Sequence, residues 1–313
     1  MLKFSVLIPT FKTKFLKECL LSIVNQTDSD LEVIVVDDHS PENIKEIVAE
    51  VNDNRIKYYR NEQNCGAKNV VDNWNICLQY ASGDFVICMG DDDVLAPNCL
   101  EVYGQLIEKY PNLGVYHTRS YIIDEDSKPF RATERRSEKE NTLDLIWRSI
   151  NGGCTQFIGD FLYNRQMLLN DGGFYKLPFA WGSDYLTAFI GSTHGGIVHT
   201  NEPLFRYRKN RYTISSSSNA DEKIKAQHQL YDWIDKFVIE YNPQNEDERV
   251  SKTMILDNVG VARKKALAFE LMIDMQSSGI TGFLNWITHT SKYKISIPLV
   301  FYSYIQSLKS KFK

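Results

Sequence analysis

The sequence lacks any apolar run of about 18 residues, the length that a membrane-spanning helix requires. A strand is predicted at residues 4–8, which leaves no room for a secretory leader ahead of it. With a net charge of -4, the chain lacks the excess of positive charge that a general nucleic-acid-binding surface needs. We therefore expect a cytoplasmic globular protein, either soluble or bound peripherally to a membrane.

The six cysteines show no CxxC spacing, and several lie inside apolar stretches. Such cysteines are typical of small core residues in a reducing compartment, so neither a zinc site nor a disulfide framework is expected. Repeats of the kind found in solenoids are also missing. What remains is a chain of 313 residues with 43% hydrophobic content, enough for one large core and a smaller second unit.

An α/β fold is predicted for the first 118 residues. Short apolar runs at residues 4–8, 32–36, 56–60, 85–89 and 115–118 alternate with segments of helical periodicity. The positions Leu16, Cys19, Leu20 and Ile23 have the spacing of one buried helix face. From residue 221 onward the pattern is helical, and an apolar stripe predicted to be buried runs along one long helix at Ile255, Val259, Ala262, Ala266, Phe269 and Ile273.

Polar residues follow the predicted strands. In an open parallel sheet, ligands bind beyond the carboxyl ends of the strands. Here those ends carry Pro9 and Thr10, then Asp37 and Asp38, and then an acidic turn at residues 91–93. The sequence thus places polar groups where a ligand is expected.

The acidic turn, Gly90-Asp91-Asp92-Asp93, is the most informative of these ends. Adjacent carboxylates repel one another unless a cation or backbone donors offset their charge. Hard oxygen ligands suit Mg2+ or Mn2+, ions that commonly hold substrate phosphates. A solvated turn in which Asp93 caps the next helix explains the residues by themselves equally well.

Three motifs, in the order in which they occur along the chain, resemble those of family 2 glycosyltransferases with the GT-A fold. They are Ile8-Pro9-Thr10-Phe11, the run from Val35 to Ser40, and the run from Gly83 to Asp93. The resemblance covers roughly residues 1–215. It implies a Rossmann-like, mostly parallel sheet flanked by helices, with a nucleotide-binding half at 1–118, an acceptor-binding half at 119–220 and a helical C-terminal extension at 221–313.

The resemblance also implies an activity. Such an enzyme transfers a sugar, with inversion, from a nucleoside diphosphate donor to a saccharide or lipid-linked saccharide in surface polysaccharide synthesis. A UDP-sugar is the preferred donor, since the carboxylate of Asp38 suits the imide N–H of uracil. The cofactor is expected to be Mn2+ or Mg2+, with Asp92 as the direct ligand and Asp93 holding the ion, a water or the following backbone.

Several further residues are expected at the donor by the same resemblance. Pro9, Thr10 and Phe11 would contact the nucleotide, and Phe11 either stacks on the base or is an ordinary core residue. Asp91 would face the ribose. Lys68 would approach the ribose or phosphates from a helix start, although a solvated first-turn lysine fits its position too.

On the acceptor side, Asp184 matches the catalytic base. The commoner family form has Glu before this Asp, where the chain has Ser183. A helix N-cap is the simpler role for Asp184, and Trp181 is either a sugar-stacking platform or a core residue. The basic segment 206–211 resembles a loop that closes over the diphosphate, with Arg208 and Arg211 as the phosphate-binding residues.

Two other activities are compatible with parts of the sequence. A sugar-nucleotide pyrophosphorylase would need a Gly-rich, basic phosphate loop soon after the first strand, and residues 9–20 contain none. A catalytically silent nucleotide-sugar-binding or scaffold protein is the other alternative. The presence of Asp38, Asp92 and Asp184 argues against it.

The C-terminal segment contains no acidic residue from Met275 to Lys313. Its lysines accompany an apolar face, which predicts a basic amphipathic helix over 292–313. Such a helix either lies on an anionic bilayer surface or docks on its own protein. Lysines 292, 294, 309, 311 and 313 carry the charge, and the face is formed by Phe301, Tyr304, Ile305, Leu308 and Phe312.

Overall fold

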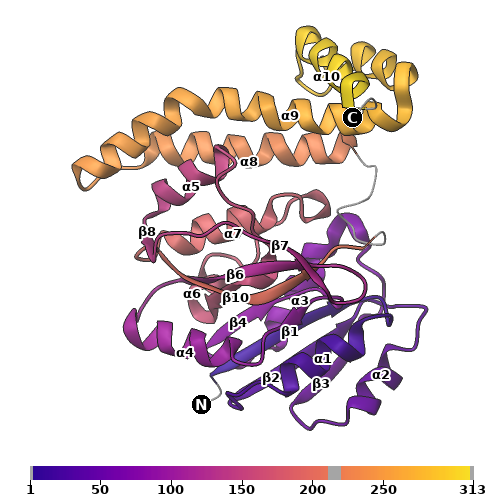
Figure 1. Ribbon diagram of the computed structural model, residues 1–313, viewed down its shortest axis with the longest axis vertical. Coiled ribbons are helices and arrows are strands. Elements are labelled where there is room, and N and C mark those ends of the chain that lie inside the picture. Colours follow the sequence, from indigo (N-terminus) through magenta and orange to yellow (C-terminus); the bar gives the residue numbers. More distant parts are fainter. Residues whose placement is uncertain (1–2, 211–219, 311–313) are drawn as a thin grey trace.

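The computed structural model describes residues 3–210 and 220–310, which form one curled sheet covered by helices (Figure 1). The strand order in the sheet is β3-β2-β1-β4-β9-β6-β10-β5, with β7 on β6 and β8 on β10. The strands are β1 (Phe4–Thr10), β2 (Leu31–Asp37), β3 (Ile56–Arg60), β4 (Phe85–Cys88), β5 (Val94–Leu95), β6 (Val115–Ile123), β7 (Pro129–Ala132), β8 (Lys139–Glu140), β9 (Phe161–Asn164) and β10 (Ile197–Arg208).

The helices lie on both faces of this sheet and above it. They are α1 (Leu16–Val24), α2 (Ile44–Val51), α3 (Val70–Tyr80), α4 (Cys99–Lys109), α5 (Thr142–Ile150), α6 (Arg165–Asn170), α7 (Ser183–Ser192), α8 (Ala220–Glu240), α9 (Glu246–Thr288) and α10 (Ile297–Ser310). Short 3-10 turns occur at η1 (Ala67–Asn69), η2 (Ile158–Asp160) and η3 (Pro178–Ala180).

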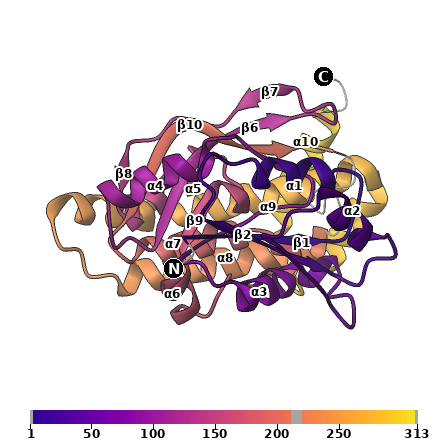
Figure 2. The same cartoon turned by 90° about the horizontal axis from the view of Figure 1, so that it is seen from below.

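Strands β1, β2 and β4 are parallel and buried on both faces, whereas β3, at the edge of the sheet, is parallel to β2 and only partly buried. Val6 and Ile8 of β1 belong to the core cluster beneath α1, while Leu7 between them belongs to the cluster that contains the buried side chains of α3. Helices α1 and α3 accordingly lie on opposite faces of the sheet (Figure 2). Strands covered on both faces appear in a sequence as continuous apolar runs, which explains why the sequence predicted them well. The predicted buried face of α1 is confirmed.

The second half of the sheet differs from the sequence prediction. Strand β9, which was not predicted, lies between β4 and β6 and is antiparallel to both. The segment that contains Arg206 and Arg208 was predicted to be a loop. It is instead the end of β10, which pairs with β6 in parallel and with β5 in antiparallel fashion.

Helices α8 and α9 form an antiparallel pair that covers α5 and α7 (Figure 1). The predicted stripe on α9 is correct only for its first half. Ile255, Val259 and Ala262 are buried, but Phe269 and Ile273 are exposed. Along the second half the buried residues are Leu267, Leu271 and Met275, because this part of the helix packs against α10 and the start of α8 rather than against the main core.

The chain bends at Gly279, whose backbone is not helical, and α10 then packs on the end of α9. This C-terminal unit has its own core, which includes Trp286, Tyr293, Ile295 and Val300. Among the helices of the described residues, none is both long and apolar enough to cross a bilayer.

Candidate active site

A cavity of about 1190 Å³ lies between the strand ends and the C-terminal helices. Its walls come from the ends of β1 and β2, the acidic turn, the start of α7, and α8 and α9. Nine of the residues predicted for the site line this one cavity. They are Pro9, Thr10, Phe11, Asp38, Asp91, Asp92, Asp93, Trp181 and Asp184.

Asp38 is held firmly at the end of β2. Its Oδ1 accepts hydrogen bonds from the backbone N–H of Cys65 at 2.9 Å and from Asn61 Nδ2 at 2.8 Å. Phe11, on the facing strand end, lines the same cavity with 40% of its surface exposed, so it is available to stack on a ligand and is not a core residue. The adjacent Asp37 is fully buried, and its carboxylate accepts from Ser40, Tyr58 and Arg60, which makes it structural.

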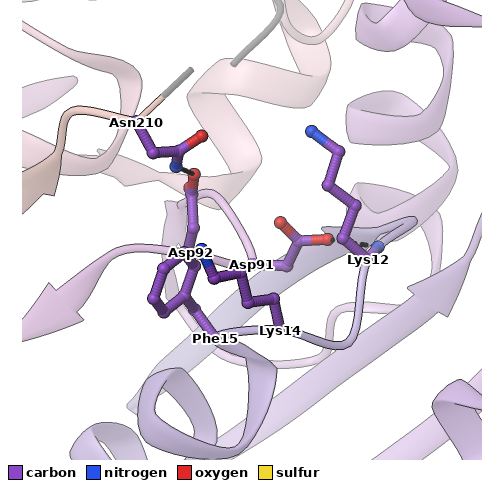
Figure 3. Close-up of a pocket in the computed structure, with 6 residues that line it drawn as sticks. All are labelled: Lys12, Lys14, Phe15, Asp91, Asp92 and Asn210. Carbon is purple, nitrogen blue, oxygen red and sulfur yellow. Dashed lines mark hydrogen bonds between the residues drawn. The ribbon is translucent and has the colours of Figure 1, made fainter. Parts of the chain in front are cut away.

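Asp91 joins the acidic turn to the end of β1 (Figure 3). One oxygen, Oδ2, accepts three hydrogen bonds of 2.9 Å, from Thr10 Oγ1 and from the backbone N–H groups of Phe11 and Lys12. This oxygen therefore fixes the backbone of residues 10–12 against the turn.

Asp92 and Asp93 have different surroundings. Asp92 Oδ2 accepts from the side-chain amide of Asn210 at 2.7 Å (Figure 3), while Asp93 accepts from the backbone N–H groups of Arg208 and Gly90. Burial and the neighbouring charge of Asp91 raise the pKa of Asp92 to about 6. Burial, with the charge of Asp92, raises the pKa of Asp93 well above its usual value. The turn is thus held in a conformation whose negative charge is not fully compensated by the protein.

The acidic turn leaves little space for a side chain at position 90. A Cβ atom there would lie 2.8 Å from Asp92 Oδ1 and 3.0 Å from Asp93 Oδ2, closer than ordinary packing allows. The absence of a side chain at Gly90 leaves room for both carboxylates to fold back over the turn.

The acidic turn fits a divalent cation that is shared with a substrate. Within the described ranges, no group of three His, Cys, Asp or Glu side chains is arranged to hold an ion without further ligands. Mg2+ bound with nucleotides usually takes only one or two carboxylates and completes its shell with phosphate oxygens and water. Asp92, which lines the cavity, and Asp93 behind it can supply that donor set.

The position of Arg208 contradicts the prediction that this residue binds phosphate. Its side chain is fully buried and does not line the cavity. The guanidinium donates to the carbonyl of Asp92 at 2.7 Å and to the carboxylate of Glu18 at 2.8 Å, and it lies 4.3 Å from the centre of the Phe15 ring. Because these partners are all within the protein, Arg208 supports the acidic turn from behind and does not clamp a diphosphate in this structure.

One further predicted residue lies away from the cavity, and another is not described by the structure. Lys68 lies outside its lining and forms an ion pair of 3.2 Å with Glu222 at the start of α8, which fits the solvated-residue interpretation. Arg211 lies outside the described residues.

Asp184 stands in the first turn of α7 and is half-buried. Gly182 before the helix has a φ of 94°, a left-handed conformation that side chains disfavour and that turns the chain into the helix at this point. Ser183 is buried and its Oγ accepts from the backbone N–H of Leu177 at 3.1 Å, which anchors the turn. Burial raises the pKa of Asp184 to about 7. A carboxylate with this pKa is suited to accept a proton near neutral pH.

Trp181 contacts the C-terminal helices. Its Nε1 donates to Glu270 Oε1 on α9 at 3.0 Å, and the ammonium of Lys223 on α8 lies 4.2 Å from the ring centre. The ring is half-buried and lines the cavity, so both its platform and its packing roles have structural support.

Sequence reasoning missed the cavity residues that come from late in the chain. Gln227 and Glu270 lie on two helices, where single polar residues among many carry no motif. Asn210, the hydrogen-bond partner of Asp92, carries no motif either. Lys12, which is not among the predicted site residues, also lines the cavity beside Asp91. Only the folded chain brings these groups together.

Comparison with known proteins agrees with this arrangement. The model of the family described as Glycosyl transferase family 2 matches residues 5–173. The chain belongs to glycosyl transferase family 2. It is therefore a glycosyltransferase, as its motifs predicted, and the matched segment contains the strand ends and the acidic turn but none of α7, α8 or α9.

Two curated glucosyltransferases illustrate the range of similarity. The GalNAc(5)-diNAcBac-PP-undecaprenol beta-1,3-glucosyltransferase of Campylobacter jejuni is 40% identical over 228 residues, which cover 70% of this chain and 69% of that protein. The UDP-Glc:alpha-D-GlcNAc-diphosphoundecaprenol beta-1,3-glucosyltransferase WfgD of Escherichia coli is 26% identical over 235 residues, which cover 75% of this chain and 86% of that protein.

Solved structures confirm the predicted GT-A fold. TarS of S. aureus, residues 1–349, in complex with UDP-GlcNAc matches with a TM-score of 0.65 at 16% identity, covering 99% of this chain and 91% of that one. The mannosyltransferase PcManGT from Pyrobaculum calidifontis, in complex with GDP-Man and Mn2+, matches with a TM-score of 0.58 at 14% identity and covers 99% of this chain and 88% of that one.

Proposed function

We propose that this family 2 enzyme transfers a sugar from a UDP-sugar to a lipid-linked saccharide during bacterial surface polysaccharide synthesis, with inversion at the anomeric carbon. The observation that carries the proposal is the position of Asp184. This carboxylate, with a pKa of about 7, lines the same cavity as Asp38 and the acidic turn. A proton acceptor thus shares one enclosed space with the groups expected to bind a nucleotide.

On this proposal the cavity has a donor side and an acceptor side. Asp38 accepts a hydrogen bond from the base, Phe11 stacks on it, and Asp91 holds the end of β1 beside the ribose. Residues 1–118 form the donor half, residues 119–220 form the acceptor half, and residues 221–313 form the helical extension. Asp184, at the start of α7, takes the proton from the acceptor hydroxyl as that oxygen attacks the anomeric carbon.

The acidic turn is proposed to hold Mn2+ or Mg2+ through Asp92, with Asp93 in support. A bound divalent ion would stabilise the charge that develops on the leaving diphosphate. The contribution of the chain itself is to fix the turn from behind through Arg208 and Asn210 and to leave the Asp92 carboxylate facing the cavity.

The lipid-linked acceptor is proposed from the two curated relatives, whose names specify undecaprenol-linked saccharides. A UDP-sugar is proposed from the carboxylate of Asp38 and from the UDP-glucose donor that the name of the E. coli relative specifies. The proposal is tested by incubating the protein with UDP-glucose or UDP-GlcNAc, Mn2+ and GlcNAc-diphosphoundecaprenol while UDP release is measured.

Release of UDP that requires the acceptor supports the proposal, and the anomeric configuration of the product then tests inversion. Turnover that requires pyrophosphate would indicate a pyrophosphorylase instead. Absence of turnover, with nucleotide binding retained, would indicate a silent relative.

A peripheral membrane contact at the inner face of the cell membrane is part of the proposal. The outer face of α10 exposes Ile297, Phe301 and Ile305, each about half exposed, together with Leu308. These residues follow i, i+4, i+8 and i+11 spacing, and the charges on this part of the chain are basic only. Apolar side chains flanked by lysines fit a bilayer that contains anionic lipid. Lys311, Phe312 and Lys313 of the predicted basic helix lie outside the described residues.

The contact is best tested with point substitutions, because deletion after residue 292 would remove Tyr293, Ile295 and Val300 from the C-terminal core. Phe301→Ser combined with Ile305→Ser should abolish sedimentation with vesicles that contain phosphatidylglycerol. The matched control is Ile239→Ser on α8, a comparably exposed isoleucine. Unchanged sedimentation of the double variant would contradict the contact.

A further inference from the structure

The cavity is larger than a sugar nucleotide requires. Its volume of about 1190 Å³ exceeds the roughly 300–1000 Å³ typical of pockets for a single small ligand. Four of the lining residues come from α8 and three from α9, helices that lie beyond the segment matched by the family model. The C-terminal helices thus enclose space next to Asp184 that the donor groups at the strand ends do not occupy.

Two ionisable residues are buried where α8 and α9 meet beside the cavity. Glu270 and Lys223 are only 4% and 6% exposed, although each carries an ionisable group. Burying such charges is costly, and replacing a buried ion pair with apolar residues is often neutral or stabilising. Packing of α8 on α9 alone therefore gives no reason to bury the carboxyl of Glu270, whereas a ligand in the cavity that Glu270 lines does.

Glu270 and Lys223 both contact Trp181, which precedes Asp184 in the chain. Glu270 Oε1 accepts from Trp181 Nε1 at 3.0 Å, and Lys223 lies over the Trp181 ring. Trp181 stands three positions before Asp184 in the chain. Gln227, one helical turn after Lys223 on α8, lines the cavity beside Glu270, and its amide is one of the hydrogen-bonding groups that act on the Glu270 carboxyl.

We propose that Glu270 and Gln227 form a binding subsite for the saccharide of the acceptor. A carboxylate that accepts from two sugar hydroxyls and an amide that both donates and accepts are the groups suited to a saccharide. Lys223 is a positioning residue that covers one face of Trp181 and keeps the Glu270 carboxylate in place. The inference rests on the proposed function and identifies the part of the enzyme that selects the acceptor.

The ligand of this subsite is the acceptor rather than the donor because of where the groups lie. Phe11, Asp38 and the acidic turn follow the ends of β1, β2 and β4, respectively. Glu270 instead lines the cavity beside Trp181, its hydrogen-bond partner, which is close to Asp184 in the chain. A sugar held there lies next to the base that takes the proton from the acceptor hydroxyl.

The first test compares Gln227→Ala with Gln229→Ala, a matched control because Gln229 is an exposed glutamine on the same helix. With GlcNAc-diphosphoundecaprenol as acceptor probe, Gln227→Ala should raise the acceptor KM about fivefold or more. The KM for the UDP-sugar and the rise in melting temperature caused by UDP should stay within twofold of wild type. Gln229→Ala should leave all of these values unchanged.

The second test removes both buried charges, so that no unpaired charge is left to unfold the protein. The double variant Lys223→Met with Glu270→Gln should fold, bind UDP as wild type does, and raise the acceptor KM by tenfold or more with a smaller change in kcat. A purely structural role would lower UDP binding and kcat together without a selective rise in the acceptor KM.

The outcomes separate this inference from the proposed function. If the wild-type enzyme transfers sugar but the acceptor KM is unchanged in both variants, the acceptor subsite is wrong and the transferase assignment stands. If the wild-type enzyme releases no UDP in the presence of the probe, the proposed function is contradicted, and this inference falls with it.

Discussion

The side-chain amide of Asn210 donates a hydrogen bond of 2.7 Å to Asp92 Oδ2, although the two residues are 118 positions apart in the sequence. Asn210 lies two residues after the end of β10, so the strand that closes the second half of the sheet also positions the residue that orients the carboxylate proposed to bind the metal. The contact lowers the pKa of Asp92, in opposition to burial and to the charge of Asp91, which raise it.

Asn210→Ala should therefore weaken metal binding. Without the amide, the pKa of Asp92 rises above about 6, so at pH 7 more of the carboxyl is protonated and unable to bind a cation. Loss of such a supporting residue typically costs about 10–100-fold in metal affinity. We expect the Mn2+ concentration for half-maximal activity to rise by about tenfold at pH 7 and by less at pH 8.5. Lys209→Ala, on the exposed neighbour, is the control, and an unaltered Mn2+ titration for Asn210→Ala would contradict the role.

Asp184→Asn should abolish most of the activity while the nucleotide site stays intact. A general base contributes about 10²–10⁴-fold to the rate, and asparagine cannot accept the proton. We expect kcat to fall by that amount with unchanged UDP binding. Because the pKa of Asp184 is about 7, wild-type kcat should rise about tenfold per pH unit below 7 and level off above it. A pH-independent kcat between pH 5.5 and 8 would show that another group acts as the base.

Ionisation of Asp184, which the catalytic role requires, lowers the stability of the folded protein. Its folded-state pKa of about 7 lies above the unfolded value, so its protonated form favours folding at low pH and this contribution is lost as pH rises through 7. Asp184→Asn cannot ionise and should be more stable than wild type at pH 8 by about 1–3 kcal/mol. Urea titrations of both proteins at pH 4.5 and pH 8 measure this difference, which should be clearly smaller at the lower pH. An equal difference at both pH values would contradict the raised pKa.

Arg208→Met should destabilise the fold. The substitution removes the hydrogen bonds to the exposed Glu18 and to the Asp92 carbonyl, and it leaves that part-buried carbonyl without this partner. Breaking a buried charged network costs about 3 kcal/mol or more in free energy of unfolding. Arg206→Met, two residues earlier on the same strand and half-buried, should cost less than about 0.5 kcal/mol. Equal urea midpoints for the two variants would show that the contacts of Arg208 contribute little.

The first half of the sheet could be predicted from the sequence because its signals are local. Each buried parallel strand is one continuous apolar run, and the polar groups of Asp38 and of the acidic turn directly follow such runs. Asp184 could be placed for a similar reason, since it lies at the start of a helix after a glycine turn.

The rest depends on contacts between distant segments. Arg208 has the appearance of a basic loop residue in the sequence, and only the pairing of β10 with β5 and β6 shows that it is buried. The role of Glu270 could not be predicted, because one acidic residue on a 43-residue helix looks like its solvated neighbours in the sequence. Only the folding of α8 and α9 over Trp181 distinguishes it.

The central claim, a nucleotide-sugar site built on the acidic turn, is tested most directly by thermal unfolding. Melting temperatures are measured with UDP, GDP, dTDP and CDP, each with and without Mn2+, for wild type and Asp92→Ala. Ligand at about 100 times its dissociation constant stabilises the folded state by about 2.7 kcal/mol. The account predicts a rise with UDP that requires Mn2+ and is lost in Asp92→Ala. A melting temperature that no nucleotide changes, or a UDP effect that persists in Asp92→Ala, would contradict it.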